Sequence, residues 1–241
     1  MKQAKDYIIF PLDVSSPDDA KRYVELLANH VGLFKVGHEL FIRSGPDIVR
    51  FINSAGTAGV FLDLKLHDIP NTVAAAVRAL VPLAPAYLNV HAAGGGDMMA
   101  AAARAAHEAA GDAGLAGPKM LAVTVLTSLS EADLNDIGVN GSPRDQVLRL
   151  AALAAKNGMD GVVCSAEEVE MLRHEMGPKF SLVVPGIRPA GAAQHDQKRV
   201  MTPEAAIAAG ADVLVIGRAI TQNPDPSQAA QAIADSLGLG A

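Results

Sequence analysis

Short apolar runs recur along the chain, and most are followed by a segment with helix-start signals. The apolar runs predict eight β-strands, at residues 7–13, 33–37, 61–70, 86–91, 120–126, 160–164, 180–184 and 212–216. The segments between them predict helices at residues 17–30, 44–56, 70–83, 97–110 and 142–158, short ones from 130 and 165, and further ones at 202–210 and 226–237. Several begin with a capping Ser or Thr and a Pro at the first helical position, as in Ser16-Pro17-Asp18-Asp19.

The order of these elements indicates the fold class. Strands that alternate with helices are typical of an α/β protein with a parallel sheet. Eight such units favour a closed (β/α)8 TIM barrel over an open doubly wound sheet, and a length of 241 residues suits that barrel. No linker, composition break or obvious repeat interrupts the chain, so we expect residues 1–241 to form a single TIM-barrel domain.

The third predicted strand breaks the apolar pattern of the others. Because side chains alternate between the two faces of a strand, Asp63 and Lys65 share one face. Leu62, Leu64 and Leu66 share the other face. Strands of a covered parallel sheet are buried on both faces, so the charged pair points into a largely desolvated space. Charges there are costly unless they are paired or have a chemical task.

The composition argues against two classes of partner. Half of the residues are apolar, which allows a large core. The formal charge of −6 and the pI near 5.6 argue against nucleic acid and against an anionic membrane as partner. A small anionic substrate stays compatible with this balance, because local basic residues decide its binding.

Cysteine content and apolar run lengths predict the compartment. Cys164 is the only cysteine, which excludes an intrachain disulfide and suits a reducing environment. Its apolar neighbours predict a packed core residue, with a catalytic thiol as the alternative. No run is long enough to span a membrane, and the run after the N-terminus is too short for a signal peptide. We therefore expect a soluble, cytoplasmic protein.

Candidate chemistry gathers at the carboxyl ends of the predicted strands, where TIM barrels place their reactive residues. The polar residues there are Asp13, Lys35, Asp63, Lys65, His91, Thr127, Ser128, Arg188 and Arg218. Four charged residues in this region alternate in sign along the chain: Lys35, Asp63, Lys65 and Asp68. Packed together, such a set neutralises itself and still opposes a charge on a substrate. The alternative is a structural ion-pair network without a chemical task.

Two features predict a phosphate site. Gly217 after the eighth strand lets backbone amides approach an anion, and Arg218 adds a charge-assisted contact, where barrels often bind phosphate. The loop 189–198 is rich in small residues and is a candidate mobile lid, with Gln197 as a neutral donor to phosphate. The alternatives are a turn glycine followed by a solvated arginine, and a loop that only connects its neighbours.

Cofactor motifs are absent from the sequence. It contains no Gly-rich dinucleotide fingerprint, no P-loop and no H-E-x-x-H spacing. A divalent metal held by His67, His91 and nearby carboxylates is an alternative, although a histidine at a strand end more often hydrogen-bonds a neighbour. We therefore expect chemistry without a metal or another cofactor.

The third strand also resembles a known family. Its D-x-K-x-x-D pattern is similar to the signature of the orotidine 5′-phosphate decarboxylase family in its bacterial form, in the residues Asp63-Leu64-Lys65-Leu66-His67-Asp68-Ile69-Pro70. Further matching motifs extend over nearly the whole chain: Leu12-Asp13, Lys35-Val36-Gly37, Asn89-Val90-His91-Ala92-Ala93-Gly94-Gly95, Val125-Leu126-Thr127-Ser128, Gly161-Val162-Val163-Cys164-Ser165, Pro185-Gly186-Ile187-Arg188-Pro189, Asp196-Gln197 and Ile216-Gly217-Arg218. The signature alone also occurs in related barrels, the ketogulonate-phosphate decarboxylases and hexulose-phosphate synthases.

The resemblance implies the decarboxylation of orotidine 5′-monophosphate (OMP) to UMP without a cofactor, the last step of de novo pyrimidine nucleotide synthesis. It implies that Lys65 protonates C6 of the pyrimidine as carbon dioxide leaves, and that Asp63 lies against the substrate carboxylate. Lys35 and Asp68 would complete the charged set. Asp68 and Thr72 would reach the site from the second subunit of a homodimer.

The resemblance also implies contacts to the rest of the substrate. Asp13 and Lys35 would hold ribose hydroxyls, and Thr127 and Ser128 would lie near the pyrimidine. The residues near the phosphate would be Arg188, Gln197, Gly217 and Arg218.

Two residues depart from the family pattern. Pro11 stands where Ala is usual and is expected to shift Asp13 slightly. His195 stands where a small or acidic residue is usual and is expected to alter the motion of the lid.

Two other functions stay open. A magnesium-dependent sugar-phosphate lyase of the same superfamily predicts a metal-binding carboxylate at the end of the second strand, where this chain has Lys35. A catalytically idle barrel that binds a nucleotide as a scaffold is the other, although every charged residue that the chemistry needs is present.

Overall fold

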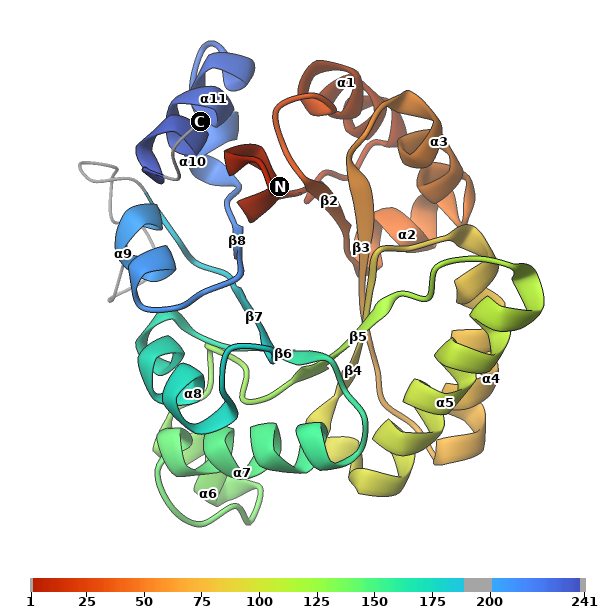
Figure 1. Cartoon of the computed structure of the whole chain (residues 1–241), viewed down its shortest axis with the longest axis vertical. Helices are drawn as coiled ribbons and strands as arrows, with labels where there is room; N and C mark the ends of the chain where they lie inside the picture. The colour runs from red at the N-terminus through yellow and green to blue at the C-terminus, as the bar shows by residue number, and fades with distance from the viewer. Residues whose placement is uncertain (1, 189–200, 239–241) are drawn as a thin grey trace.

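The structure, a computed structural model, describes residues 2–188 and 201–238. Its parallel strands form a closed barrel in sequence order, each paired with the next and β8 with β1 (Figure 1). The strands are β1 (Ile8–Pro11), β2 (Leu33–Val36), β3 (Gly59–Leu66), β4 (Tyr87–His91), β5 (Lys119–Val123), β6 (Gly161–Val163), β7 (Ser181–Val184) and β8 (Val213–Val215). The α/β fold class and the (β/α)8 TIM barrel expected from the alternation are confirmed.

Helices surround the barrel as an outer ring (Figure 1). The α-helices are α1 (Pro17–Leu27), α2 (His38–Ser44), α3 (Asp47–Ala55), α4 (Pro70–Leu80), α5 (Gly96–Ala113), α6 (Glu131–Asp136), α7 (Pro143–Lys156), α8 (Val169–Met176), α9 (Pro203–Ala208), α10 (Arg218–Thr221) and α11 (Pro226–Ser236). The 3-10 helices are η1 (Ala4–Tyr7), η2 (Val81–Leu83), η3 (Ala92–Gly94) and η4 (Ala166–Glu168). None of the helices in the described part of the chain is long and apolar enough to cross a membrane.

Side-chain caps explain several helix starts. In five of the described helices, the capping side chain accepts a backbone amide of the first turn, which otherwise has no intrahelical partner. These caps are Ser16 for α1, Ser130 for α6, Ser142 for α7, Thr202 for α9 and Asp225 for α11. The capping residues therefore mark helix starts that the sequence pattern predicts.

Some element bounds differ from the predicted ones. The helix expected from 44 to 56 is α3, which begins a few residues later, at Asp47, and has Gly56 as its C-cap. The sequence pattern did not predict α2, which follows β2 directly and has Gly45, with a φ of +57°, as its C-cap. The N-cap of α2 is Gly37, which has no side chain that could cap the helix or indicate its start in the sequence. At other ends the shifts are small: β5 stops at Val123, and α5 continues to Ala113.

Apolar side chains fill two regions of the barrel. Outward-facing strand residues pack under the helices in one large cluster. A smaller cluster lies inside the barrel and contains Ile9, Leu33, Phe61, Leu121, Val183 and Val213. The next inward position on a strand is two residues later and one layer nearer the carboxyl end. On β2 and β3 these positions are Lys35 and Asp63, so the inner cluster forms an apolar floor beneath charged residues.

The amino ends of the strands carry polar contacts of another kind. Arg173 of α8 donates to three backbone carbonyls and to the carboxylate of Asp212, with 2.6 Å between Nη2 and Oδ2. The same Asp212 oxygen accepts the backbone amide of Leu182 at 2.8 Å. These bonds fasten α8 to the starts of β7 and β8, so they stabilise the end of the barrel opposite to the candidate chemistry.

Cys164 lies in the core directly after β6, with 1% of its surface exposed. Burial, and next the carboxylate of Glu168, raise the pKa of its thiol well above the ordinary value. A thiol in this state is a poor nucleophile. The predicted role as a packed core residue is confirmed, and the alternative of a catalytic thiol is not supported.

Candidate active site

Charged side chains meet above the apolar floor, at the carboxyl ends of the first three strands. The ammonium of Lys35 lies 2.8 Å from Oδ1 of Asp13 and 3.5 Å from Oδ2 of Asp63. The ammonium of Lys65 lies 2.6 Å from Oδ1 of Asp63. We call Asp13, Lys35, Asp63 and Lys65 the charged array. Asp63 is its centre, because its carboxylate lies between the two ammonium groups.

Asp63 is nearly buried, with 9% of its surface exposed. Burial raises its pKa, but the charges of Lys35 and Lys65, and hydrogen bonds from Lys65 and Asn89, lower it by more. The pKa of Asp63 therefore lies below its ordinary value of 3.8, and the group is an anion at neutral pH. As an anion it holds the ammonium of Lys65 in place by charge and by a hydrogen bond.

The expected division of β3 into two faces is confirmed. Leu62 is part of the outer core, and Leu64 and Leu66 pack against it. Asp63 and Lys65 point to each other in the charged array. The backbone is less regular than a strand pattern suggests, because Lys65 has a φ of +46°, in the left-handed region that favours glycine.

Asn89 of β4 connects the two charged residues of β3. Its Nδ2 donates to Oδ1 of Asp63 at 2.7 Å, and its Oδ1 accepts the backbone amide of Lys65 at 2.8 Å. The side chain is fully buried. It therefore supports the positions of both groups from inside the barrel.

Histidines lie around Lys65. Nε2 of His38 donates to the carbonyl of Leu64 at 2.8 Å, and the rings of His67 and His91 have centroids 5.5 Å apart. Burial, and then the charges of His67 and Lys65, lower the pKa of His91 below its ordinary value of 6.5. His91 is therefore neutral at pH 7 and adds no charge to the array. In the described residues, no group of three or more His, Cys, Asp or Glu is arranged to hold a metal ion.

Asp68 and Thr72 are not part of the charged array of their own chain. Both are exposed, and the carboxylate of Asp68 accepts the backbone amide of Ile69 at 2.6 Å. Among the described residues Asp68 forms no ion pair, so Asp13 rather than Asp68 completes the set of four within one chain. Asp68 and Ile69 line a hollow of about 500 Å³ that also borders Gly94 of η3.

Other predicted site residues follow later strands. Thr127 and Ser128 are exposed in the loop after β5. Arg188 follows β7 and is buried, with 7% of its surface exposed. The predicted lid 189–198, with His195 and Gln197, falls outside the described residues.

The predicted phosphate pair, Gly217 and Arg218, lies where α10 begins after β8. A Cβ added to Gly217 would lie 2.8 Å from Cγ of Pro11, so the ring of Pro11 packs against a backbone that must be glycine. Pro11 pairs with Lys35 across β1 and β2, and Asp13 keeps its ion pair with the same lysine. The proline therefore leaves Asp13 in the charged array.

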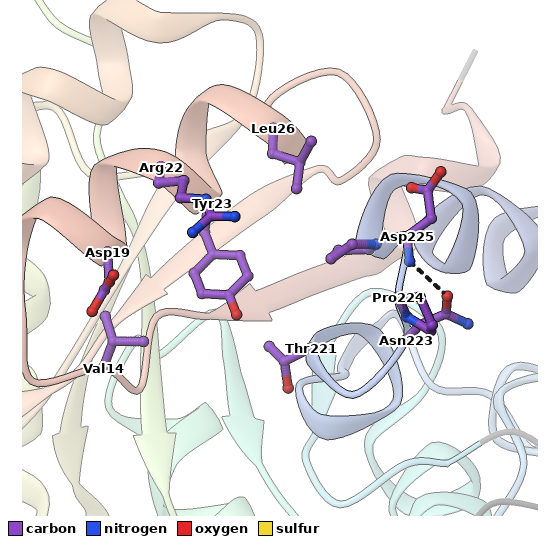
Figure 2. A pocket seen from close by; sticks show the side chains of 10 residues that line it. Val14, Asp19, Arg22, Tyr23, Leu26, Thr221, Asn223, Pro224 and Asp225 are labelled. Carbon is purple, nitrogen blue, oxygen red and sulfur yellow. Dashed lines mark hydrogen bonds between the residues drawn. The ribbon is translucent and has the colours of Figure 1, made fainter.

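A cavity of about 720 Å³ lies beside the mouth of the barrel, between α1 and the segment that follows α10 (Figure 2). Val14, the residue after Asp13, forms one edge, and Tyr23 and Thr221 face each other across it (Figure 2). No member of the charged array lines this cavity. It is therefore separate from the site formed by β1, β2 and β3.

Asn89 and His38 have no assigned role in the sequence pattern, although both contact the segment around Lys65. Asn89 carries a detectable signal, because it is a polar residue in an apolar strand and shares a face with His91. His38 carries none, since it follows the predicted strand 33–37 like any loop residue.

Comparisons with known proteins agree with one another. The sequence profile of the orotidine 5′-phosphate decarboxylase / HUMPS family matches residues 6–233. Orotidine 5′-phosphate decarboxylases from Thermobifida fusca (strain YX) and Rhodospirillum rubrum are each 53% identical to this chain over 230 residues, which cover 95% of the chain and 95% and 93% of the relatives. The crystal structure of orotidine 5′-phosphate decarboxylase from Lactobacillus acidophilus aligns with a TM-score of 0.84 at 37% identity, over 95% of this chain and 98% of that one.

Proposed function

The chain belongs to the orotidine 5′-phosphate decarboxylase / HUMPS family, and we propose that Lys65 is the proton donor of its reaction. The activity is that of orotidine 5′-phosphate decarboxylase, a carboxy-lyase that releases carbon dioxide from OMP and produces UMP in pyrimidine synthesis. One observation supports the assignment of the chemistry above all others. The ammonium of Lys65 lies 2.6 Å from Asp63, next to Lys35, at the carboxyl end of the barrel.

The task of the site is to stabilise a carbanion. When carbon dioxide leaves C6 of the pyrimidine, the bonding electron pair stays on C6 in the plane of the ring, where the ring π-system cannot delocalise it. A fixed ammonium group next to C6 stabilises this charge without reorganising at the moment of reaction. In the proposal Nζ of Lys65 then gives C6 a proton, which forms the C6–H bond of UMP and leaves a neutral amine.

Asp63 and Lys35 prepare the position of that ammonium. The carboxylate of Asp63 accepts a hydrogen bond from Lys65 and also lies 3.5 Å from the Lys35 ammonium, so it is held from two sides. In the proposal Asp63 faces the substrate carboxylate, and the departure of carbon dioxide relieves the repulsion between the two anions.

The remaining contacts bind parts of OMP that do not react. We propose that Asp13 and Lys35 hold the ribose hydroxyls and that Thr127 and Ser128 lie near the pyrimidine. The proposed phosphate contacts are Arg188, Gln197, Gly217 and Arg218. Binding energy from a phosphate far from C6 can be used to hold the reacting groups together.

We also propose a homodimer in which Asp68 and Thr72 of each chain reach the neighbouring site. Both residues are exposed, and Asp68 forms no ion pair among the described residues of its own chain. Ile69, which follows Asp68, is 67% exposed and offers apolar surface to a partner. The cytoplasmic location stays a proposal too, supported by the single, buried cysteine.

Lys35 argues against a metal-dependent sugar-phosphate lyase. Such an enzyme needs a carboxylate at the end of β2, and this chain has an ammonium there, 2.8 Å from Asp13 and 3.5 Å from Asp63. The Lys35 ammonium forms ion pairs with the two carboxylates that a divalent cation would need as ligands, and its charge repels that cation.

The activity is tested by following the ultraviolet absorbance of OMP with purified protein in the presence of EDTA. We expect the absorbance to change continuously at an undiminished rate, because no step requires a metal ion. An absorbance that stays constant would refute the proposal. Activity that disappears with EDTA and returns with Mg²⁺ would instead favour the lyase.

A further inference from the structure

Asn89 joins Asp63 and Lys65 in one closed unit of hydrogen bonds. Its Nδ2 donates to Oδ1 of Asp63 at 2.7 Å, and its Oδ1 accepts the Lys65 amide at 2.8 Å. The Lys65 ammonium donates to the same Asp63 oxygen at 2.6 Å. The Asn89 side chain is 0% exposed, so these contacts are shielded from water.

The chemistry of the partners fixes the orientation of the Asn89 amide. A carboxylate only accepts hydrogen bonds and a backbone N–H only donates them. The NH2 group must therefore face Asp63, and the oxygen must face the amide of Lys65. A side chain at this position has to supply one donor and one acceptor at once, which Asn does.

The hydrogen bond from Asn89 supports Lys65 at a point where β3 forms a bulge. The pairing of β3 with β4 is regular up to Leu62 and resumes at Leu66, so three residues of β3, 63–65, face the single residue Asn89 of β4. A bulge removes ladder partners from the backbone, and the Asn89 side chain replaces one of them. Within the bulge Lys65 has a φ of +46°, which a lysine keeps only when its surroundings hold it.

We propose that Asn89 is a positioning residue of the decarboxylation, which sets the direction in which Lys65 leaves β3 and the plane of the Asp63 carboxylate. This role rests on the proposed function, in which the Lys65 ammonium meets C6 of OMP. Asn89 has no exposed surface to offer a substrate, so it acts through the other two residues. Small displacements of a proton donor lower the rate of reaction more than the affinity for substrate.

The first test is Asn89→Ala, which removes both hydrogen bonds. We expect kcat for OMP to fall between about 10-fold and about 100-fold, because each lost bond involves a charged or strained group. We expect KM and the Kd for UMP to change less than about threefold, since the ribose and phosphate contacts come from other residues. Steady-state kinetics and titration with UMP measure the two effects separately.

Thr124→Val is the matched control. Thr124 is also buried, with 4% of its surface exposed, and its hydroxyl donates to the carbonyl of Val163 at 3.1 Å near the same end of the barrel. We expect this variant to unfold at a lower temperature than the wild type and to keep its kcat. An equal loss of kcat in both variants would overturn the proposal, because any buried hydrogen bond near the mouth would then have the effect.

A second variant, Asn89→Asp, keeps the shape of the side chain and the acceptor for the Lys65 amide. While ionised it cannot donate to Asp63, but protonation restores a donor. We therefore expect its kcat relative to the wild type to rise as the pH falls from about 8 to about 5.5. A pH profile parallel to that of the wild type would contradict the role of Asn89, and a purely structural residue would change only the unfolding temperature.

The wild-type protein assayed beside the variants separates two kinds of failure. A wild type without activity on OMP would overturn the proposed function and with it the role of Asn89. An active wild type together with an unchanged kcat in Asn89→Ala would overturn the role of Asn89 alone.

Discussion

Within the charged array, charges are balanced before any substrate enters. Two carboxylates, Asp13 and Asp63, and two ammonium groups, Lys35 and Lys65, lie within ion-pair distance of their neighbours. A neutral set is less costly to desolvate than separate charges are. It also offers no excess charge that would bind the substrate carboxylate tightly in the ground state, so in the proposed mechanism the Lys65 ammonium stabilises the new charge on C6.

Two substitutions test the proposed roles of Lys65 as proton donor and of Arg218 as a binding residue. We expect Lys65→Ala to lower kcat by about 10³-fold or more, because it removes both the proton and the stabilising charge. We expect Arg218→Ala to raise the KM for OMP by about 10-fold to 100-fold with a smaller effect on kcat, because it removes the proposed charge-assisted phosphate contact. Steady-state kinetics of the purified variants test both. The same effects on kcat and KM in the two variants would contradict the assigned roles.

Three members of the charged array, Lys35, Asp63 and Lys65, could be predicted from the sequence, because a two-residue period puts Lys35 and Asp63 above inward-facing apolar residues. The fourth differs, since Asp13 stands in one chain where the sequence pattern suggested Asp68. Lys35 follows Leu33 by two positions, and Asp63 follows Phe61 by two. The role of Asn89 could not be predicted, because it depends on a bulge between two strands that are distant in sequence. Neither hydrophobic pattern nor turn residues signal that bulge.

For individual elements, the effect of a glycine depends on what lies near its missing side chain. Gly161 begins β6 and pairs with Ser181 of β7, whose backbone occupies the space that a Cβ would need. Gly111 lies in α5, and nothing lies within 4 Å of a Cβ added there. The first glycine permits close strand packing, whereas the second only lowers the stability of a helix.

Substitution by alanine is therefore expected to have opposite effects at these two positions. We expect Gly161→Ala to lower the free energy of unfolding by about 1–3 kcal/mol, because β6 and β7 have to move apart. We expect Gly111→Ala to raise it by about 0.5–1 kcal/mol through helix propensity. For a chain of this size each kcal/mol corresponds to about 2–4 °C in Tm, which thermal unfolding resolves. Equal changes in Tm would show that the strand spacing is not limiting.

Strands and capped helices could be predicted from the sequence because the residues that form each of them carry a signal in their own segment. An apolar run marks a strand, and a side chain such as Ser142 marks the start of a helix. The α2 helix had no such signal, since it begins at Gly37 directly after β2 without a capping side chain. Elements that depend only on tertiary packing are therefore the ones that the pattern misses.

The molecule as a whole separates chemistry from mechanical support along the barrel axis. The charged array lies at the carboxyl ends of the strands, and the bonds of Arg173 and Asp212 lie at the amino ends. Counting the alternating units was enough to predict the closed barrel. That residues 1–241 form one domain stays a prediction, and assembly with a second subunit leaves no periodic signal in a single chain.

The proposed dimer makes a prediction about mixtures of two inactive variants. Lys65→Ala and Asp68→Ala are each expected to be inactive alone. When the two chains are co-expressed, a mixed dimer contains one site with Lys65 from one chain and Asp68 from the other. Random pairing then restores about a quarter of the wild-type activity, because half of the dimers are mixed and each has one complete site.

The alternative arrangement gives a different result. If Asp68 acted in the site of its own chain, every site in the mixture would lack one residue, and the mixture would stay inactive. Sedimentation of the wild type, measured in parallel, reports whether a dimer is present at the concentration of the assay.

The buried thiol of Cys164 also makes the native chain inert to maleimides and other alkylating labels, because these reagents need an accessible thiolate. Since the sequence has no second cysteine, one introduced on the surface would be the sole target of a fluorescent or spin label, with no need to remove the native residue first. The reverse also holds: a molecule that takes up a label at Cys164 has exposed the apolar layer in which this residue is buried, and the rate of labelling of the wild type would measure how often that layer opens.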